Sequence, residues 1–104
     1  MSTEHSGKDL LTEMRDLMRR LHYSIHTERA YCDWVARFVR FHQMQARNAL
    51  FVDAEENVEV FLTHLAIQKN VAVSTQSQAF NALVFLYKQI LQRPMENVFV
   101  ARST

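Results

Sequence analysis

The chain has almost none of the two residues that most β-rich folds need for their turns, with one glycine and one proline in 104 residues. Sandwiches, barrels and doubly wound sheets turn tightly many times, and those turns depend on glycine and proline. Hydrophobic residues make up 48% of the chain, which is enough for the core of a single domain. We therefore expect one compact all-α domain.

Four stretches carry apolar residues at the period of an α-helix. The predicted helices are Lys8–Leu21, one from Ser24 or Thr27 to about Met44, one that opens at Asp53, and one from Val73 to Pro94. Segment 45–52 is predicted to be a linking loop, and Pro94 to stop the last helix. Helices of this length with short connections predict a four-helix domain.

Short polar or acidic residues stand where three of these helices should begin, which is typical of N-terminal caps. A capping box pairs such a residue with Glu or Gln three positions later. The candidates are Ser24 or Thr27 for the second helix, Asp53 with Glu56 for the third, and Thr75 with Gln78 for the fourth.

The second predicted helix has an aromatic side and a basic side. The aromatic side holds Thr27, Tyr31, Trp34, Phe38 and Phe41, and the basic side holds His26, Arg29, Asp33, Arg37 and Arg40. Amphipathic helices normally bury their apolar side. We expect Trp34 and Phe38 to be buried against the first and fourth helices, and the arginines to lie in solvent.

Charge is spread unevenly, although the net charge of the whole chain is only +1. Residues 14–47 hold seven arginines and three acidic residues, a net charge of +4. A basic half on a helical domain indicates a polyanionic partner, while a basic helix face is also common on ordinary solvated surfaces.

The start of the fourth predicted helix complements this basic side with short polar side chains. Ser74, Gln78 and Asn81 share one side, with Ser77 next to them. Such side chains donate to phosphates and contact base edges in DNA. The candidate DNA-binding residues are therefore His26, Thr27, Arg29, Arg37, Arg40, Ser74, Thr75, Ser77, Gln78 and Asn81.

Other chemistry finds little support in the residue pattern. Of the five histidines, His22 and His26 are four residues apart but lack the glutamate of the zinc-hydrolase motif, so we expect no metal. Cys32 is alone on a predicted helix, which is typical of a small core residue and of a reducing cytosol. With Gly7 as the sole glycine, there is no phosphate-binding glycine loop. We expect no catalysis and no cofactor.

Two blocks of residues resemble the N-terminal core-binding domain of integron integrases, a branch of the tyrosine recombinases. The first block is His22-Tyr23-Ser24, Thr27-Glu28, Ala30-Tyr31, Trp34, Arg37-Phe38 and Phe41-His42. The second block is Val58-Glu59, Phe61-Leu62-Thr63-His64-Leu65-Ala66, Val71-Ala72, Ser74-Thr75-Gln76, Gln78-Ala79, Ala82-Leu83 and Phe85-Leu86-Tyr87. The resemblance extends from about Leu10 to Leu91. The family commonly has basic residues at the places of Leu21 and His26.

The resemblance implies a SAM-like fold of the phage-integrase N-terminal type over residues 1–93. In such domains the second and fourth helices face duplex DNA, and the protomers assemble as a tetramer on recombination sites. It also implies that residues 94–104 begin a linker to a separate catalytic domain, and that none of the three tyrosines here is the nucleophile. The expected location is the cytoplasm, with no membrane contact. The alternative from a different class is a helical protein–protein interaction module.

The third predicted helix has a second apolar side, formed by Val60 and Ile67. One hypothesis is that the apolar cluster Val98-Phe99-Val100 folds back over this side or over the end of the fourth helix. The other is that this side docks against a catalytic domain or another protomer, because exposed apolar patches commonly mark interaction sites.

Overall fold

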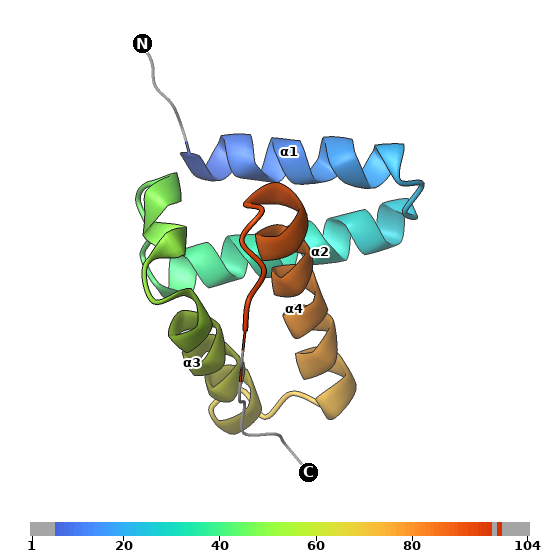
Figure 1. Cartoon of the computed structure of the whole chain (residues 1–104). Coiled ribbons are helices and arrows are strands. Elements are labelled where there is room, and N and C mark those ends of the chain that lie inside the picture. The colour runs from blue at the N-terminus through green and yellow to red at the C-terminus, as the bar shows by residue number, and fades with distance from the viewer. Residues whose placement is uncertain (1–5, 97, 99–104) are drawn as a thin grey trace.

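The structure is a computed structural model that describes residues 6–96 and residue 98. These residues form helices and contain no strand, which confirms the all-α prediction. The elements in chain order are α1 (Ser6–Arg20), α2 (Ile25–Phe41), the 3-10 helix η1 (Arg47–Phe51), α3 (Ala54–Ile67), α4 (Val73–Phe85) and the π-helical segment η2 (Leu86–Ile90) (Figure 1).

Helix α2 is the central element of the fold. It runs antiparallel to α1, and α3 and α4 extend together from one side of this pair (Figure 1). α2 packs most extensively against α4 and α1, and α3 packs against α4. The segment η2 lies against α1 and closes the bundle. One side of α2 is therefore held in the core, and its position relative to α4 is fixed.

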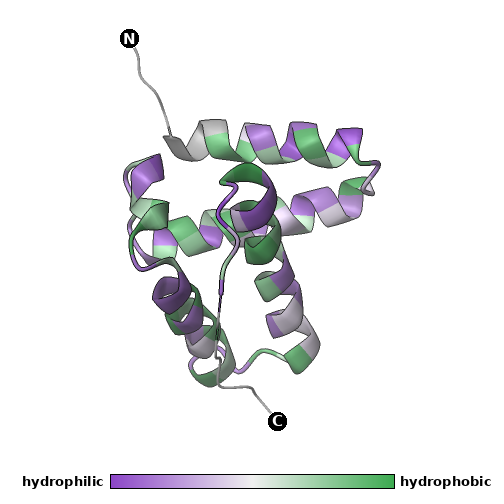
Figure 2. Cartoon of the chain, viewed as in Figure 1, coloured by the Kyte–Doolittle hydropathy of each residue, from purple (hydrophilic) through white to green (hydrophobic). Residues whose placement is uncertain are grey.

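Each helix buries one stripe of apolar side chains, and apolar and polar residues alternate along α1 and α2 (Figure 2). On α1 the buried stripe is Leu10, Met14 and Met18, spaced four residues apart. Leu21 was predicted to be the last residue of this helix, but it lies beyond α1 and is 48% exposed, because α1 ends at Arg20 and the chain turns away.

The aromatic side of α2 supplies the centre of the core, as the sequence predicted. Trp34 is 6% exposed and Phe38 is fully buried. The Phe38 ring meets the Phe61 ring edge-on, with centroids 5.6 Å apart, and the Tyr87 ring at 6.4 Å. Helix α3, through Phe61, is thus a packing partner that the prediction did not name.

One of the three predicted N-terminal caps is confirmed. Ser24 caps α2, and its Oγ accepts a hydrogen bond from the Thr27 backbone N–H at 3.0 Å. The Asp53 prediction is wrong: its backbone is left-handed (φ 51°), not extended as a capping side chain requires, and makes no side-chain cap. The predicted box of Thr75 and Gln78 is also wrong, because α4 begins one turn earlier, after Ala72.

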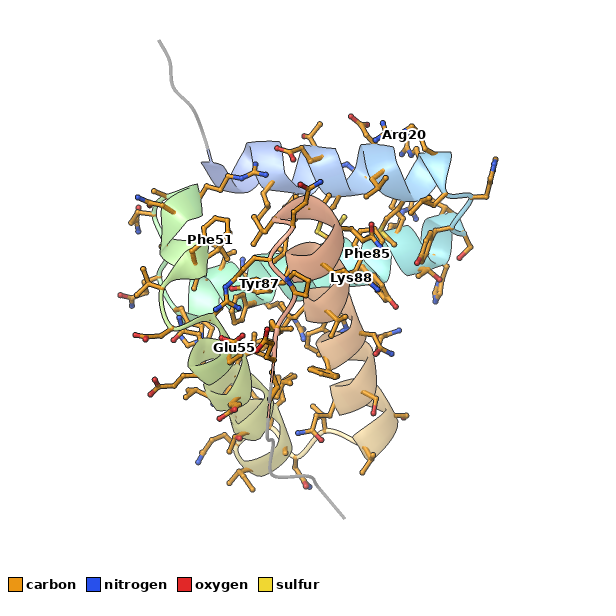
Figure 3. The ribbon with its side chains drawn as sticks, in the orientation of Figure 1. Arg20, Phe51, Glu55, Phe85, Tyr87 and Lys88 are labelled. Carbon is orange, nitrogen blue, oxygen red and sulfur yellow. The ribbon has the colours of Figure 1, made fainter. Side chains whose placement is uncertain are left out.

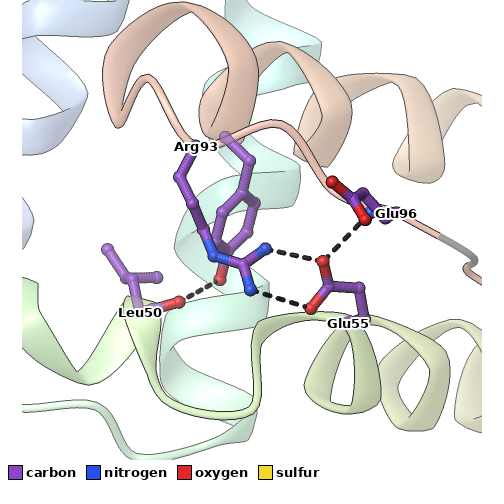
Figure 4. A network of polar contacts seen from close by, with 5 residues as sticks. Leu50, Glu55, Arg93 and Glu96 are labelled. Carbon is purple, nitrogen blue, oxygen red and sulfur yellow. Dashed lines mark hydrogen bonds and ion pairs between the residues drawn. The ribbon is translucent and has the colours of Figure 1, made fainter.

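A polar network joins the end of the last helix to η1 and α3 (Figure 4). The buried Tyr87 hydroxyl donates to the Leu50 carbonyl at 2.8 Å. Arg93 donates twice to Glu55, at 2.6 and 3.1 Å, and the Glu96 backbone N–H donates to the same carboxylate at 3.0 Å. The pairing with Arg93 lowers the pKa of Glu55 from 4.5 to about 2. Arg93 and Glu96, which follow η2, are thus attached to α3.

The second apolar side of α3 is open: Val60 is 47% exposed and Ile67 is 60% exposed. Met95 and Val98 are partly buried against the core and line a hollow with Phe80 of α4. Of the predicted cluster, Val98 lies over α4, in line with one of the two positions proposed for it, and Val60 and Ile67 stay exposed. Phe99 and Val100 lie outside the described residues.

Candidate nucleic-acid interface

The predicted DNA-binding residues lie on α2 and α4, the two helices that pack most extensively against each other. Most of their side chains are exposed, and three are partly buried. The exposed ones are His26, Arg29, Arg37, Arg40, Ser74, Gln78 and Asn81, and the partly buried ones are Thr27, Thr75 and Ser77. All ten are thus at least partly accessible to a ligand.

Trp34 connects the basic side of α2 to the polar side of α4. Its indole Nε1–H donates to the Gln78 side-chain oxygen at 3.0 Å, across 44 residues of sequence. The Arg37 guanidinium lies over the same indole ring, 4.8 Å from the centroid, in a cation–π contact. One buried tryptophan therefore positions a cation from α2 and an amide from α4. The sequence identified Trp34 only as a core residue.

Ion pairing leaves the outer side of α2 predominantly basic. Glu28 is buried and accepts two hydrogen bonds from Arg19 of α1, at 3.0 and 3.3 Å, and this pairing raises the pKa of Arg19. Asp33 is 3.5 Å from the Arg37 guanidinium, and both side chains are at least half exposed. In the described part of the chain, Arg29 and Arg40 have no carboxylate partner.

The first turn of α2 is ordered by its own capping contacts. The Ser24 hydroxyl donates to the Thr27 hydroxyl at 3.0 Å while it accepts from the Thr27 N–H. Thr27 is thus part of the cap as well as a candidate contact, and its neighbour His26 is exposed. The structure does not bring His26 and Thr27 to α4 in the way that it joins Arg37 to Gln78.

Helix α4 is oriented by a buried polar residue, Gln76, which the sequence did not indicate as part of the core. Gln76 is 2% exposed, and its amide N–H donates to the Leu62 carbonyl of α3 at 3.1 Å. This bond fixes the first turns of α4, from which Ser77 and Gln78 project. A signal was available, because Gln76 lies three and seven residues before the buried Ala79 and Leu83, on the buried stripe.

The described residues were also compared with the requirements of a metal site and of a membrane-spanning helix. Among residues 6–96 and 98, no three His, Cys, Asp or Glu side chains gather as metal ligands. None of the helices in that region is long and apolar enough to cross a membrane. Cys32 is buried, which confirms it as a core residue, and burial raises the pKa of its thiol.

Comparison with known proteins identifies the class to which this fold belongs. The family described as phage integrase, N-terminal SAM-like domain, matches residues 10–97, and the chain belongs to this family. An integrase/recombinase of Escherichia coli is 43% identical over 82 residues, and so is one of Pseudomonas aeruginosa. The match covers 79% of this chain and 23% of each relative, so the chain spans about a quarter of their length.

These findings confirm the SAM-like fold and the recombinase family that the sequence motifs indicated. The matched relatives carry the name integrase/recombinase, without reference to integrons.

Proposed function

We propose that this chain is the core-binding domain of a site-specific tyrosine recombinase of the integron integrase type. In this proposal it clamps duplex recombination-site DNA for the integration and excision of cassettes. Further protomers join it as a tetramer on the DNA, in the cytoplasm. Strand cleavage belongs to a separate catalytic domain, so we expect none from this chain by itself.

The observation that carries the proposal is the assembly of Arg37, Trp34 and Gln78 across α2 and α4. DNA recognition needs cations for the phosphates and amide or hydroxyl groups for the base edges. Here the basic side of α2 and the polar side of α4 meet at the buried Trp34 indole. The indole therefore fixes the position of the cation relative to the amide before DNA binds. Such preorganisation reduces the entropy that binding must overcome.

The test is a fluorescence-anisotropy titration of a labelled duplex at several salt concentrations. We expect dissociation constants of roughly 10⁻⁴ to 10⁻⁶ M at physiological salt, because one domain makes part of the phosphate contacts of a clamp. Arg37→Ala should weaken binding to all sequences alike and reduce the slope of log K against log salt by about one unit. A wild-type chain that binds no duplex at low salt would rule out the proposal.

The matched control is Arg20→Ala. This change removes the same charge from the end of α1, on the outer side of that helix and away from α4 (Figure 3). We expect the control to keep the wild-type slope. Equal reductions for both variants would show that binding senses only net charge, and would argue against a contact face on α2 and α4.

A helical protein–protein interaction module remains the second candidate. The exposed Val60 and Ile67 favour it, since they lie one above the other on α3. The same titration separates the two functions: phosphate contacts weaken steeply with salt, whereas apolar docking of helices does not.

A further inference from the structure

A basic groove lies between α2 and the end of α3, beside the contact face already described. It has a volume of about 520 Å³, and its lining includes Arg37 and Arg40 from α2 and His64 and Lys69 from the α3 side. Phe41 and Val71 are among the apolar residues of its lining. Neither His64 nor Lys69 belongs to the residues that the sequence indicated for DNA contact.

The charge of this groove is not neutralised from within. Its lining contains no Asp or Glu. Arg40 and Lys69 make no ion pair with any described residue, while Arg19, Arg47 and Arg93 each hold a carboxylate through two hydrogen bonds. Of the three Lys and Arg side chains in the lining, Arg37 is 3.5 Å from Asp33, whereas Arg40 and Lys69 are available to an anionic ligand.

The floor of the groove is aromatic and partly exposed. The Phe41 ring is 36% exposed and stands 4.8 Å from the His64 ring and 5.4 Å from the Phe61 ring, measured between centroids. These contacts hold the Phe41 ring in place between α2 and α3. A ligand that has an apolar body beside a negative charge matches an aromatic floor with cations at its rim.

The backbone holds Lys69 at the edge of the groove. The N–H groups of Gln68 and Lys69 both donate to the His64 carbonyl, at 2.8 and 3.2 Å. Asn70 then reverses the chain through a left-handed conformation (φ 52°), and the Val71 N–H donates to the Leu65 carbonyl at 3.1 Å. Lys69 therefore projects from an ordered turn.

We propose that this groove seats one phosphodiester of the bound DNA between Arg40 and Lys69, with the adjoining deoxyribose against Phe41. The inference rests on the proposed function and extends the contact surface from α2 and α4 to α3. Phosphate is the anion that suits both an arginine fork and a lysine point charge. Backbone contacts of this kind set the orientation of a protein on DNA without reading its sequence.

The experiment compares Lys69→Gln with the wild type in the duplex titration between 50 and 200 mM salt. Each phosphate contact adds about 0.9 to the salt slope, so the wild type should lose about 3.5-fold more affinity than the variant over this range. Lys88→Gln is the matched control, because Lys88 is also exposed, lacks an ion-pair partner among the described residues and lines a separate hollow. Thermal unfolding should be the same for all three proteins.

The outcomes are distinct. A reduced slope for Lys69→Gln with an unchanged slope for Lys88→Gln supports the groove. If the wild type binds duplex DNA and Lys69→Gln keeps its slope, the groove is not a phosphate site while the proposed function stands. Equal reductions for both variants also overturn the groove, since they reflect net charge alone. Failure of the wild type to bind any duplex instead removes the proposed function.

Discussion

Among the residues that the structure describes, five other than glycine adopt a left-handed backbone, at the points where helices end or begin. They are His22, Gln43, Asp53, Asn70 and Gln92, with φ between 51° and 65°. After α2, the Gln43 N–H donates to the Arg40 carbonyl and the Met44 N–H to the Val39 carbonyl, which is the Schellman pattern. Glycine normally takes the left-handed position, because a side chain there costs about 1–2 kcal/mol. Because the chain has a single glycine, residues with side chains take these left-handed positions, and the backbone is strained there.

We predict that Gln43→Gly stabilises the protein, because it relieves this strain. The gain should be about 0.5–1 kcal/mol after the larger entropy of the unfolded glycine chain is subtracted. In a thermal melt, a gain of this size raises Tm by about 2–8 °C in a domain of this length. The control is Gln45→Gly, two residues later, where φ is not positive and glycine should leave stability the same or lower. A destabilised Gln43→Gly would contradict the interpretation.

At the scale of elements, the ion pair of Glu55 and Arg93 holds the segment after η2 against the first turn of α3 (Figure 4). The pairing lowers the pKa of Glu55 to about 2 in the folded chain. A carboxylate whose pKa is lowered by folding contributes stability that is complete above its unfolded pKa, near 4.5, and is lost as pH falls toward 2. The attachment of this segment should therefore weaken in acid.

We predict that Glu55→Gln is less stable than the wild type at neutral pH, and that the difference shrinks as pH falls from 4.5 toward 2. Urea unfolding at a series of pH values measures it. Glu56→Gln is the control, because Glu56 is exposed, adjacent, and without an ion-pair partner in the described region. A difference between wild type and Glu55→Gln that stays constant down to pH 2 would show that the ion pair is not its source.

The sequence predicted the helices well but the contacts between them poorly, because the two kinds of feature depend on different information. A helix such as α3 can be predicted because its buried apolar residues recur at the period that one buried side requires. In α3 these residues are Val58, Phe61, Leu62 and Leu65. The capping box predicted for Gln78 was wrong because α4 begins after Ala72, and the Gln78 side-chain oxygen instead accepts a hydrogen bond from the Trp34 indole. Local spacing does not reveal this contact, because the two residues are 44 positions apart in the sequence. Contacts between helices depend on crossing geometry, which no single-helix period contains.

In the candidate site, too, the features of a single helix were predictable and the contacts between helices were not. Its basic and polar sides were predictable, since each lies on one helix. The groove beside it was not, because Lys69 belongs to a turn after α3 and meets α2 only in the folded chain. Gln76, which joins α3 to α4, was also hard to predict, because its side chain is polar although it is buried in the core.

At the scale of the whole molecule, one side of α3 is covered by nothing in the described structure. Val60 and Ile67 are seven residues apart and so lie on the same side of the helix. Met95 and Val98 lie over α4 instead. An exposed apolar side of this kind is typical of an interaction site.

We predict that replacing Val60 and Ile67 together by lysine changes the free energy of unfolding by no more than about 1 kcal/mol, because exposed substitutions typically cost within 0.5 kcal/mol each. Leu62→Lys on the same helix is the contrast: Leu62 is 1% exposed, and a charge buried there should prevent stable folding. Chemical unfolding, run at two protein concentrations, measures both changes.

A double variant that loses several kcal/mol at both concentrations would mean that this side of α3 is covered within the chain itself. A loss that grows with protein concentration would mean that another copy covers it. Either loss would contradict the open surface, whereas an unchanged variant leaves α3 free to receive a partner.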